Sequence, residues 1–142
     1  SGGVFGTSAF YHVASSTATT SALNLRNNIL VNKSVAKGTG GYTVAYRRSS
    51  RVLTNYGSAS NNNLYYAGTP GSANLLFADT AAAATPANAV QTLSALKTLL
   101  ASRDASSITE DAPFLSTTST DATYLHINPT VVTGIEGGAI NI

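Results

Sequence analysis

Residues 21–32, with the sequence Ser-Ala-Leu-Asn-Leu-Arg-Asn-Asn-Ile-Leu-Val-Asn, constrain the fold more than any other stretch. Aliphatic residues fall on alternate positions before and after a central Asn pair, which predicts half-buried strands. Asparagine tolerates the left-handed backbone region better than most residues, so Asn27 and Asn28 predict a corner at which one strand bends and another resumes. We therefore expect a solenoid coil whose sheet turns and continues. The side chains expected to point inward are Leu23, Leu25, Ile29 and Val31.

The composition favours β structure outside a cell. Only 10% of the 142 residues are charged, well below the roughly 25% of ordinary soluble proteins. Recurring aliphatic and aromatic residues argue against a disordered chain. The absence of cysteine excludes disulfides, thiolate chemistry and cysteine-based zinc sites. No apolar run is long enough to cross a bilayer, so we expect no membrane span. The polar, weakly charged composition favours an extracellular or bacterial cell-surface location. Both ends of the sequence look cut, which suggests a longer parent protein.

Charge is distributed unevenly along the chain. Residues 1–78 contain no Asp or Glu, whereas all six acidic residues lie at or after Asp79. A basic half can indicate nucleic-acid binding. The six cations in that half are sparse, and a solvated strand edge that discourages aggregation explains them as well. We therefore expect no nucleic-acid partner.

The hydrophobic period becomes helical between Pro86 and about Ser102. Thr85 before Pro86 predicts an N-cap, and Asn88 with Gln91 offers a capping-box-like start one turn later. Spacings of three, three and four place four apolar residues on one face: Val90, Leu93, Leu96 and Leu100. The pattern predicts one amphipathic helix that lies against the coils.

The order of motifs in residues 21–142 resembles the C-terminal part of right-handed parallel β-helix proteins, of the secreted and surface type found in Bacteroidota-like bacteria. The matching segments are a coil with an Asn corner (23–32), a coil start of the Asn-x-Tyr-Tyr kind (61–66), and the later segments 104–108, 111–114, 121–127 and 129–134. Ala112 between Asp111 and Pro113 departs from the family pattern, as does a missing Trp. The resemblance implies a fold and an extracellular location more than an activity.

These observations predict a mainly β fold, a right-handed parallel β-helix (solenoid) fragment with one amphipathic α-helix. The alternative is a β-sandwich, which would show antiparallel pairing. We expect β-helix coils over residues 1–84, the helix insertion over 85–104, and final coils, cut short, over 105–142. The residues predicted to shape structural turns are Asn27, Asn28, Asn63, Asp104 and Asp111.

Catalysis has weaker support than structure. Glycoside hydrolysis needs two facing carboxylates, which only the second half could supply: Asp104, Glu110, Asp111 and Asp121. Asp104 and Asp111 flank turns, where a carboxylate that caps loop amides explains them. Lyase chemistry would place a Lys or Arg base beside acid-bound Ca²⁺, but cations and acids are segregated in the sequence. We expect no catalytic residue and no cofactor, with Ca²⁺ retained only for the lyase alternative.

The two histidines, His12 and His126, both lie in strand-like runs beside aromatic residues. A zinc site would require a third ligand at a defined spacing, and none is visible. We therefore interpret both histidines as strand residues and predict no metal site.

Tyrosines and neighbouring arginines are the remaining candidates for binding. Exposed aromatic rings on a flat β face can stack on sugars, and an adjacent arginine can contact an acidic glycan. The candidate ligand-binding residues are Tyr42, Tyr46, Arg47, Arg51, Tyr65 and Tyr66, with Tyr56 as a further aromatic of the same group. The competing interpretation is that these tyrosines pad the outside of the coils.

The sequence thus favours a non-catalytic structural or adhesive segment of an extracellular bacterial surface or secreted protein. Its expected partners are other segments or copies of the same protein, which could join into a fibre. The alternative is a polysaccharide-binding or polysaccharide-degrading β-helix module, with a glycan as its partner.

Overall fold

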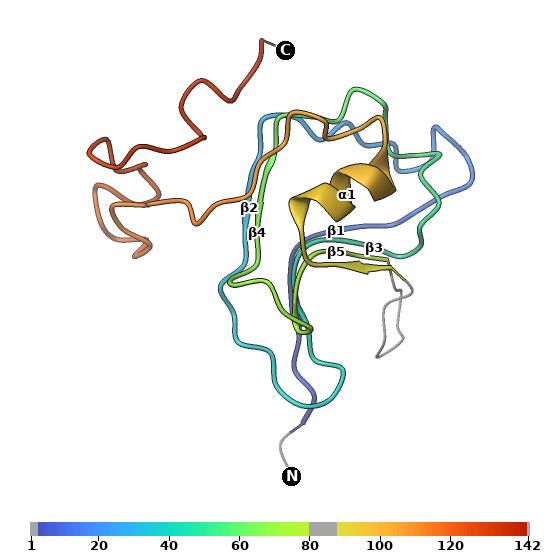
Figure 1. The fold of residues 1–142 in the computed structure, drawn as a ribbon, viewed down its shortest axis with the longest axis horizontal. Coiled ribbons are helices and arrows are strands. Elements are labelled where there is room, and N and C mark those ends of the chain that lie inside the picture. The colour runs from blue at the N-terminus through green and yellow to red at the C-terminus, as the bar shows by residue number, and fades with distance from the viewer. Residues whose placement is uncertain (1–2, 80–87, 142) are drawn as a thin grey trace.

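A computed structural model describes residues 3–79 and 88–141 of the chain, which is mainly β (Figure 1). The elements, in chain order, are β1 (Thr7–His12), β2 (Ile29–Val31), β3 (Thr43–Arg48), β4 (Leu64–Tyr66), β5 (Asn74–Ala78), β6 (Ala89–Val90) and α1 (Leu93–Leu100).

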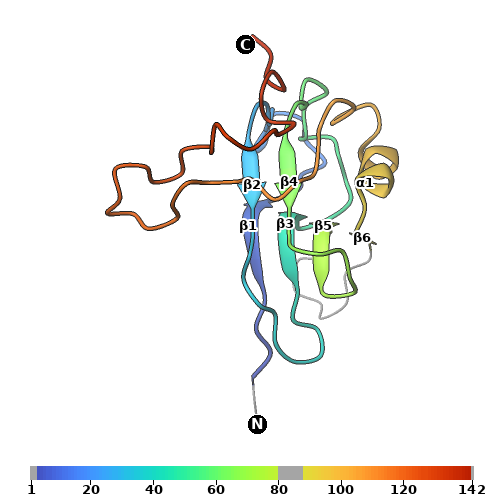
Figure 2. The same ribbon diagram turned by 60° about the vertical axis from the view of Figure 1, so that its left-hand side comes forward.

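The strands form a four-stranded sheet in the order β1-β3-β5-β6 and a two-stranded sheet of β2 and β4. β1, β3 and β5 are parallel, as are β2 and β4, and Figure 2 shows β2 and β4 above β1, β3 and β5. Thr7 faces Thr43, and Thr43 faces Asn74, so the chain returns to the same place after 36 and then 31 residues. The β-sandwich alternative requires antiparallel strand pairing. Three of the four strand pairs in the described residues are parallel, and the antiparallel one joins β5 to the two-residue β6.

The predicted asparagine corner is present. Asn27 has a φ of 57°, and so does Asn62, which lies 35 residues later. The backbone pairs on both sides of this corner, since Asn61 N donates to Leu25 O at 3.0 Å and Leu64 N donates to Asn28 O at 2.7 Å. Two successive turns of the chain therefore bend at the same place while their hydrogen bonds continue.

The corner changes which side chains point inward. Leu25 is buried, and Leu23 packs against the same core. After the corner the inward residue is Leu30, whereas Ile29 is 40% exposed and Val31 belongs to neither core cluster. The prediction that Ile29 and Val31 point inward is wrong, because a residue in the left-handed region shifts the strand alternation by one position.

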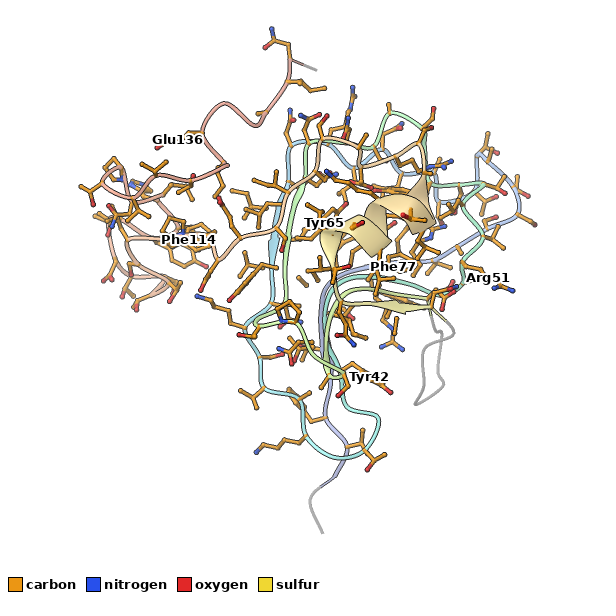
Figure 3. All side chains as sticks on the ribbon, viewed as in Figure 1. Tyr42, Arg51, Tyr65, Phe77, Phe114 and Glu136 are labelled. Atoms are coloured by element: carbon orange, nitrogen blue, oxygen red, sulfur yellow. The ribbon has the colours of Figure 1, made fainter. Side chains whose placement is uncertain are left out.

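Aromatic side chains dominate the core between the two sheets and the helix. The ring of Tyr46 lies 5.4 Å from those of Tyr56 and Phe77 and stacks on Tyr65 at 6.1 Å between centroids. All four residues are fully buried. Figure 3 shows Tyr65 and Phe77 inside the molecule beside α1.

Helix α1 closes the open side of this core. Its face of Leu93, Leu96 and Leu100 is the predicted one, with Leu96 and Leu100 fully buried. The helix begins later than expected, with Thr92 as N-cap. The expected capping residues Thr85 and Pro86 lie outside the described residues.

The segment before the helix explains the late start. Asn88 binds the Asp79 carboxylate through its backbone N–H at 2.6 Å and its side-chain amide at 2.5 Å. This contact leads the chain into β6, which pairs with β5. Val90 therefore lies on a strand and not on the predicted helix.

The region after α1 is built differently. Ile108 pairs in parallel with Leu64 and so adds a third turn at the corner. Within described residues 109–141 there is no helix or strand, and the chain swings away from the body and returns toward β2 and β4 (Figure 1). The predicted final coils over 105–142 therefore extend only to about residue 108.

Candidate functional site

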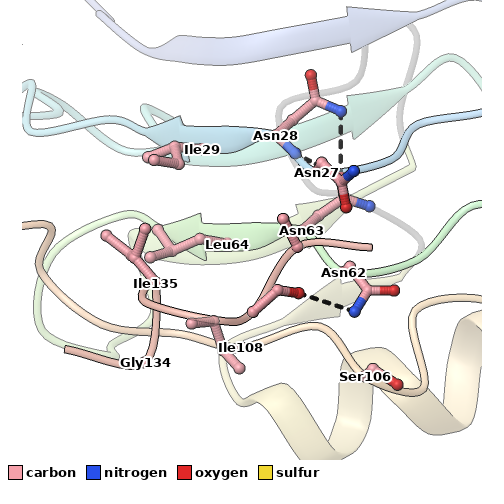
Figure 4. Close-up of a pocket in the computed structure, with 12 residues that line it drawn as sticks. Asn27, Asn28, Ile29, Asn62, Asn63, Leu64, Ser106, Ile108, Gly134 and Ile135 are labelled. Carbon is pink, nitrogen blue, oxygen red and sulfur yellow. Dashed lines mark hydrogen bonds between the residues drawn. The ribbon is translucent and has the colours of Figure 1, made fainter. Parts of the chain in front are cut away.

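The asparagine corner carries a groove that holds residues 134–140. Ile29, Leu64 and Ile108 come from three successive turns and stand beside one another on its floor. Ile135 lies over them, and a hollow of about 90 Å³ remains between these residues (Figure 4). A volume of this size accommodates part of a side chain and is too small for a sugar.

Hydrogen bonds attach residues 134–140 to this groove. Asn27 makes two contacts with Ile140, accepting from its N–H at 3.1 Å and donating to its carbonyl at 2.7 Å. Asn62 donates to the Gly138 carbonyl at 2.8 Å, as Figure 4 shows. Every one of these contacts reaches main-chain atoms of the segment.

A carboxylate completes the row of contacts. Glu110 accepts from Gly134 N–H at 2.9 Å. On the third turn Ser106 occupies the position equivalent to Asn62, and its backbone N–H binds the Asn61 side chain at 2.8 Å. The row of outward asparagines therefore ends at Asn62, and Glu110 anchors the start of the segment.

Two glycines fit the segment to the groove. A Cβ on Gly134 would lie 3.0 Å from Cδ1 of Ile108, so a larger residue would push the segment outward. Gly137 has a φ of 73°, which an L side chain rarely adopts. The groove thus receives a peptide with one aliphatic anchor followed by glycines.

A second hollow, of about 340 Å³, lies beside Tyr66 and is lined by Lys33 and Asn74 among others. Lys33 Nζ lies 6.0 Å from the centroid of the Tyr66 ring and 2.7 Å from a carboxylate oxygen of Asp111. Both charged side chains remain about half exposed, at 56% and 47%. The fold thus brings together a cation, an acid and an aromatic ring that are separated in sequence.

The other predicted binding residues do not form one surface. Tyr46 and Tyr65 are fully buried, as is Tyr56, so the prediction that these rings are available to sugars is wrong. Their hydroxyls have partners inside the protein, which is why they can be buried. Tyr42 is half-buried against the small cluster of Val44, Leu75 and Ala78.

The arginines lie elsewhere on the surface. Arg51 is exposed and far from Tyr42 in Figure 3. Arg47 stands over the ring of Tyr11 at 5.8 Å, and Tyr11 is 48% exposed. Tyr11 was not among the predicted residues, although its neighbouring position on the parallel strand is Arg47.

Asp104 is the centre of a buried polar cluster. Its carboxylate accepts from Tyr56 hydroxyl at 2.7 Å, Tyr65 hydroxyl at 2.9 Å, and Asn63 side-chain amide at 2.9 Å. Ser107 hydroxyl donates a fourth contact at 2.8 Å. Burial raises the pKa of both tyrosines well above its usual value, so the hydroxyls stay protonated as donors.

This cluster has a structural role. Asp104 also has a φ of 57°, which places a turn where the sequence predicted one. The expected capping of loop amides differs from what is found, because the carboxylate binds side-chain donors from the preceding turn and from Ser107 of its own turn. Asn63, another predicted turn residue, also donates to Leu25 O at 2.8 Å and so joins two turns. Asn28 donates to Arg26 O at 2.7 Å within the corner itself.

A second buried cluster surrounds Arg48. Its guanidinium contacts His12 Nδ1 and donates to Tyr46 hydroxyl at 3.1 Å and to Asn55 Oδ1 at 2.8 Å. Burial, and to a smaller extent the Arg48 charge, lowers the pKa of His12, while a hydrogen bond with the Ser21 carbonyl opposes the shift. Burial raises the pKa of Tyr46 to about 12. His12 is therefore a core histidine, and His126 is exposed.

Three further acidic residues have partners within the protein. Glu110 binds Gly134, Asp111 pairs with Lys33, and Asp121 accepts from the Ser116 hydroxyl. No group of three or more His, Asp or Glu residues suited to a metal ion occurs within residues 3–79 and 88–141. In the same ranges, no helix is long and apolar enough to cross a membrane.

Comparisons with protein-family models, with curated proteins and with solved structures gave no match. The functional argument therefore depends on the geometry of this chain.

Proposed function

We propose that this chain is a segment of a right-handed parallel β-solenoid that serves as a non-catalytic structural or adhesive part of an extracellular bacterial protein. The observation that carries the proposal is the stacking of turns at the Asn27 corner, with parallel registers 31 to 36 residues apart. Solenoids use such stacking to build rigid, extended scaffolds.

The use of the polar side chains supports the same role. Asp104, Asn63 and Arg48 are buried; Asn63 binds Asp104 of the next turn, and Arg48 contacts His12 of the preceding one. Polar groups consumed in this way specify the stacking of turns and are not available to a substrate. The weakly charged, polar composition suits a β protein that is exposed outside a cell.

The test combines self-association with glycan binding. Sedimentation velocity and negative-stain electron microscopy over a range of concentrations should show the purified chain forming assemblies. A panel of neutral and acidic polysaccharides should show neither binding nor turnover. Capped monomers alone, or polysaccharide turnover that is lost in Asp111→Asn, would contradict the proposal.

The second hollow favours one alternative function, the binding of an acidic glycan. Lys33 and Tyr66 place a cation and a ring beside a space large enough for a sugar. Saturable binding to an acidic polysaccharide that is lost in Tyr66→Ala would support this alternative. Tyr124→Ala is the matched control, because Tyr124 is also accessible but lies outside the hollow.

A further inference from the structure

We propose that the groove at the asparagine corner is a peptide-binding site, and that in the assembled protein its occupant is residues 134–140 of a second copy of this chain. The inference rests on the proposed structural function, because it names the partner and the contact through which copies associate.

The first step is that the groove recognises main chain. Asn27 binds both the N–H and the carbonyl of Ile140, and Asn62 binds the carbonyl of Gly138. A primary amide carries an acceptor oxygen and N–H donors side by side, which complement the N–H and the carbonyl of one residue of extended chain. These contacts would form with any extended segment in the same position, whatever its side chains.

The second step is that the spacing of the asparagines fits a peptide that crosses the turns. Neighbouring parallel strands lie about 4.8 Å apart, and two residues of extended chain span at most about 7 Å. A segment that runs along the stack can therefore meet one asparagine every two residues. The contacts at Gly138 and Ile140 have that spacing.

The third step is that the groove has one apolar subsite. Ile135 lies over the floor made by Ile29, Leu64 and Ile108 (Figure 4). Ile29 is still 40% exposed, so the floor is incompletely covered. The ligand is thus a short segment with one aliphatic anchor and following glycines, which is the chemistry of residues 134–140.

The last step concerns which copy supplies the segment. Residues 117–126, in the connection to it, are all exposed, and Figure 1 shows this part of the chain leaving the body. The connection makes its backbone contacts within itself, such as Leu115 N to His126 O at 2.8 Å. Exchange of the segment between copies would keep every groove contact, as in other swapped assemblies.

Cross-linking between two variants tests this proposal, since the full chain has no cysteine of its own. Ile29→Cys and Ile135→Cys chains are mixed, concentrated and treated with a short bis-maleimide. Mixed dimers should exceed those from a control mixture of Val52→Cys with Ile135→Cys, because Val52 is 39% exposed and lies outside the groove. Adding Asn27→Gly and Asn62→Gly to the Ile29→Cys chain keeps residues that accept the left-handed corner. These changes should reduce the mixed dimer roughly tenfold, through loss of the side-chain hydrogen bonds.

The doubly substituted chain Ile29→Cys/Ile135→Cys separates the remaining outcomes. Internal cross-linking of this chain, with no mixed dimer above the control, would show that each copy keeps its own segment and would overturn the proposal. Absence of both products would show that Ile135 does not lie beside Ile29 in either arrangement, and the proposed binding of residues 134–140 in the groove would be wrong. Self-association seen by sedimentation in either case would leave the proposed structural function standing, with another surface as the contact.

Discussion

The stacked turns up to residue 108 and the segment after them use backbone hydrogen bonds in different ways. In the stacked part, a residue binds a partner about one turn away, as Asn61 N binds Leu25 O. In residues 109–141 the backbone contacts are mostly between neighbours on one excursion, such as Asn128 N with Pro113 O at 2.8 Å. The first arrangement encloses a core, while the second leaves large apolar side chains such as Val132 exposed.

The difference shows what a regular register contributes. Turns of similar length place Phe10, Tyr46 and Phe77 in register around one interior. There the Tyr46 hydroxyl meets Arg48, and the hydroxyls of Tyr56 and Tyr65 meet Asp104. Residues 109–141 do not add another strand to the sheets, so no neighbouring turn pairs with them along a regular register. They depend on a few side chains of the first part, Asn27 and Asn62 among them, to hold their main chain.

The largest expected effect is at Asp104. Asp104→Ala leaves two tyrosine hydroxyls and the amide of Asn63 without their acceptor, and we expect a loss of about 3–5 kcal/mol in the free energy of unfolding. Denaturant unfolding followed by tyrosine fluorescence measures it. Asp121→Ala, an exposed acid in the other region, should change stability by less than about 0.5 kcal/mol. Equal losses in the two variants would contradict the contrast between the regions.

Removal of an apolar side chain should show the same contrast with a somewhat smaller effect. Leu96→Ala opens a cavity beneath α1 and should cost about 2–5 kcal/mol. Val132→Ala removes a side chain that is 95% exposed and should be neutral to within about 0.5 kcal/mol. The midpoint of urea unfolding distinguishes the two, and a neutral Leu96→Ala would mean that the helix does not cover the core.

Protonation of His12 should destabilise the stacked part alone. Burial lowers the pKa of this imidazole below its ordinary 6.5, so below that pH the unfolded chain binds the proton while the folded chain does not. Stability is therefore complete above pH 6.5 and declines as the pH falls from there toward the folded-state pKa. Unfolding curves between pH 7.5 and 5 measure the decline. His12→Gln should flatten this dependence and His126→Gln, at an exposed position, should preserve it.

The smallest expected effect on stability is that of Asn27→Gly, which tests whether the stacked turns and residues 109–141 unfold separately. Asn27→Gly keeps a residue that accepts the left-handed corner but removes the contacts with Ile140. We expect global stability to fall by less than about 1 kcal/mol, since the lost contacts are exposed. Hydrogen exchange at the Ile140 amide should accelerate, while exchange in β3 stays unchanged. Faster exchange in both places would show that the two regions unfold together.

Local chemistry was the part of this structure that the sequence could predict. The corner at Asn27 follows from asparagine's tolerance of positive φ, and the apolar face of α1 follows from spacing. The late helix start could not be anticipated, because Ala89 and Val90 suit a helix as well as the short strand they form beside β5. The shift in alternation after the corner depends on the conformation of a single residue.

Contacts between distant parts of the chain escaped prediction. From the sequence, Tyr56 and Tyr65 resemble surface residues. Their burial is explained only by Asp104, up to 48 positions later, whose carboxylate accepts hydrogen bonds from both hydroxyls. The groove joins Asn27 to Ile140, which lie 113 residues apart. Polar residues of this kind carry no local signature of the partner they bind.

The row formed by Asn27 and Asn62 has a modular consequence. Each further turn with an asparagine at that corner would extend the row by one side chain, which would bind about two more residues of the ligand's main chain. The number of turns would then determine the length of the segment that the row can bind, independently of the amino-acid sequence of that segment.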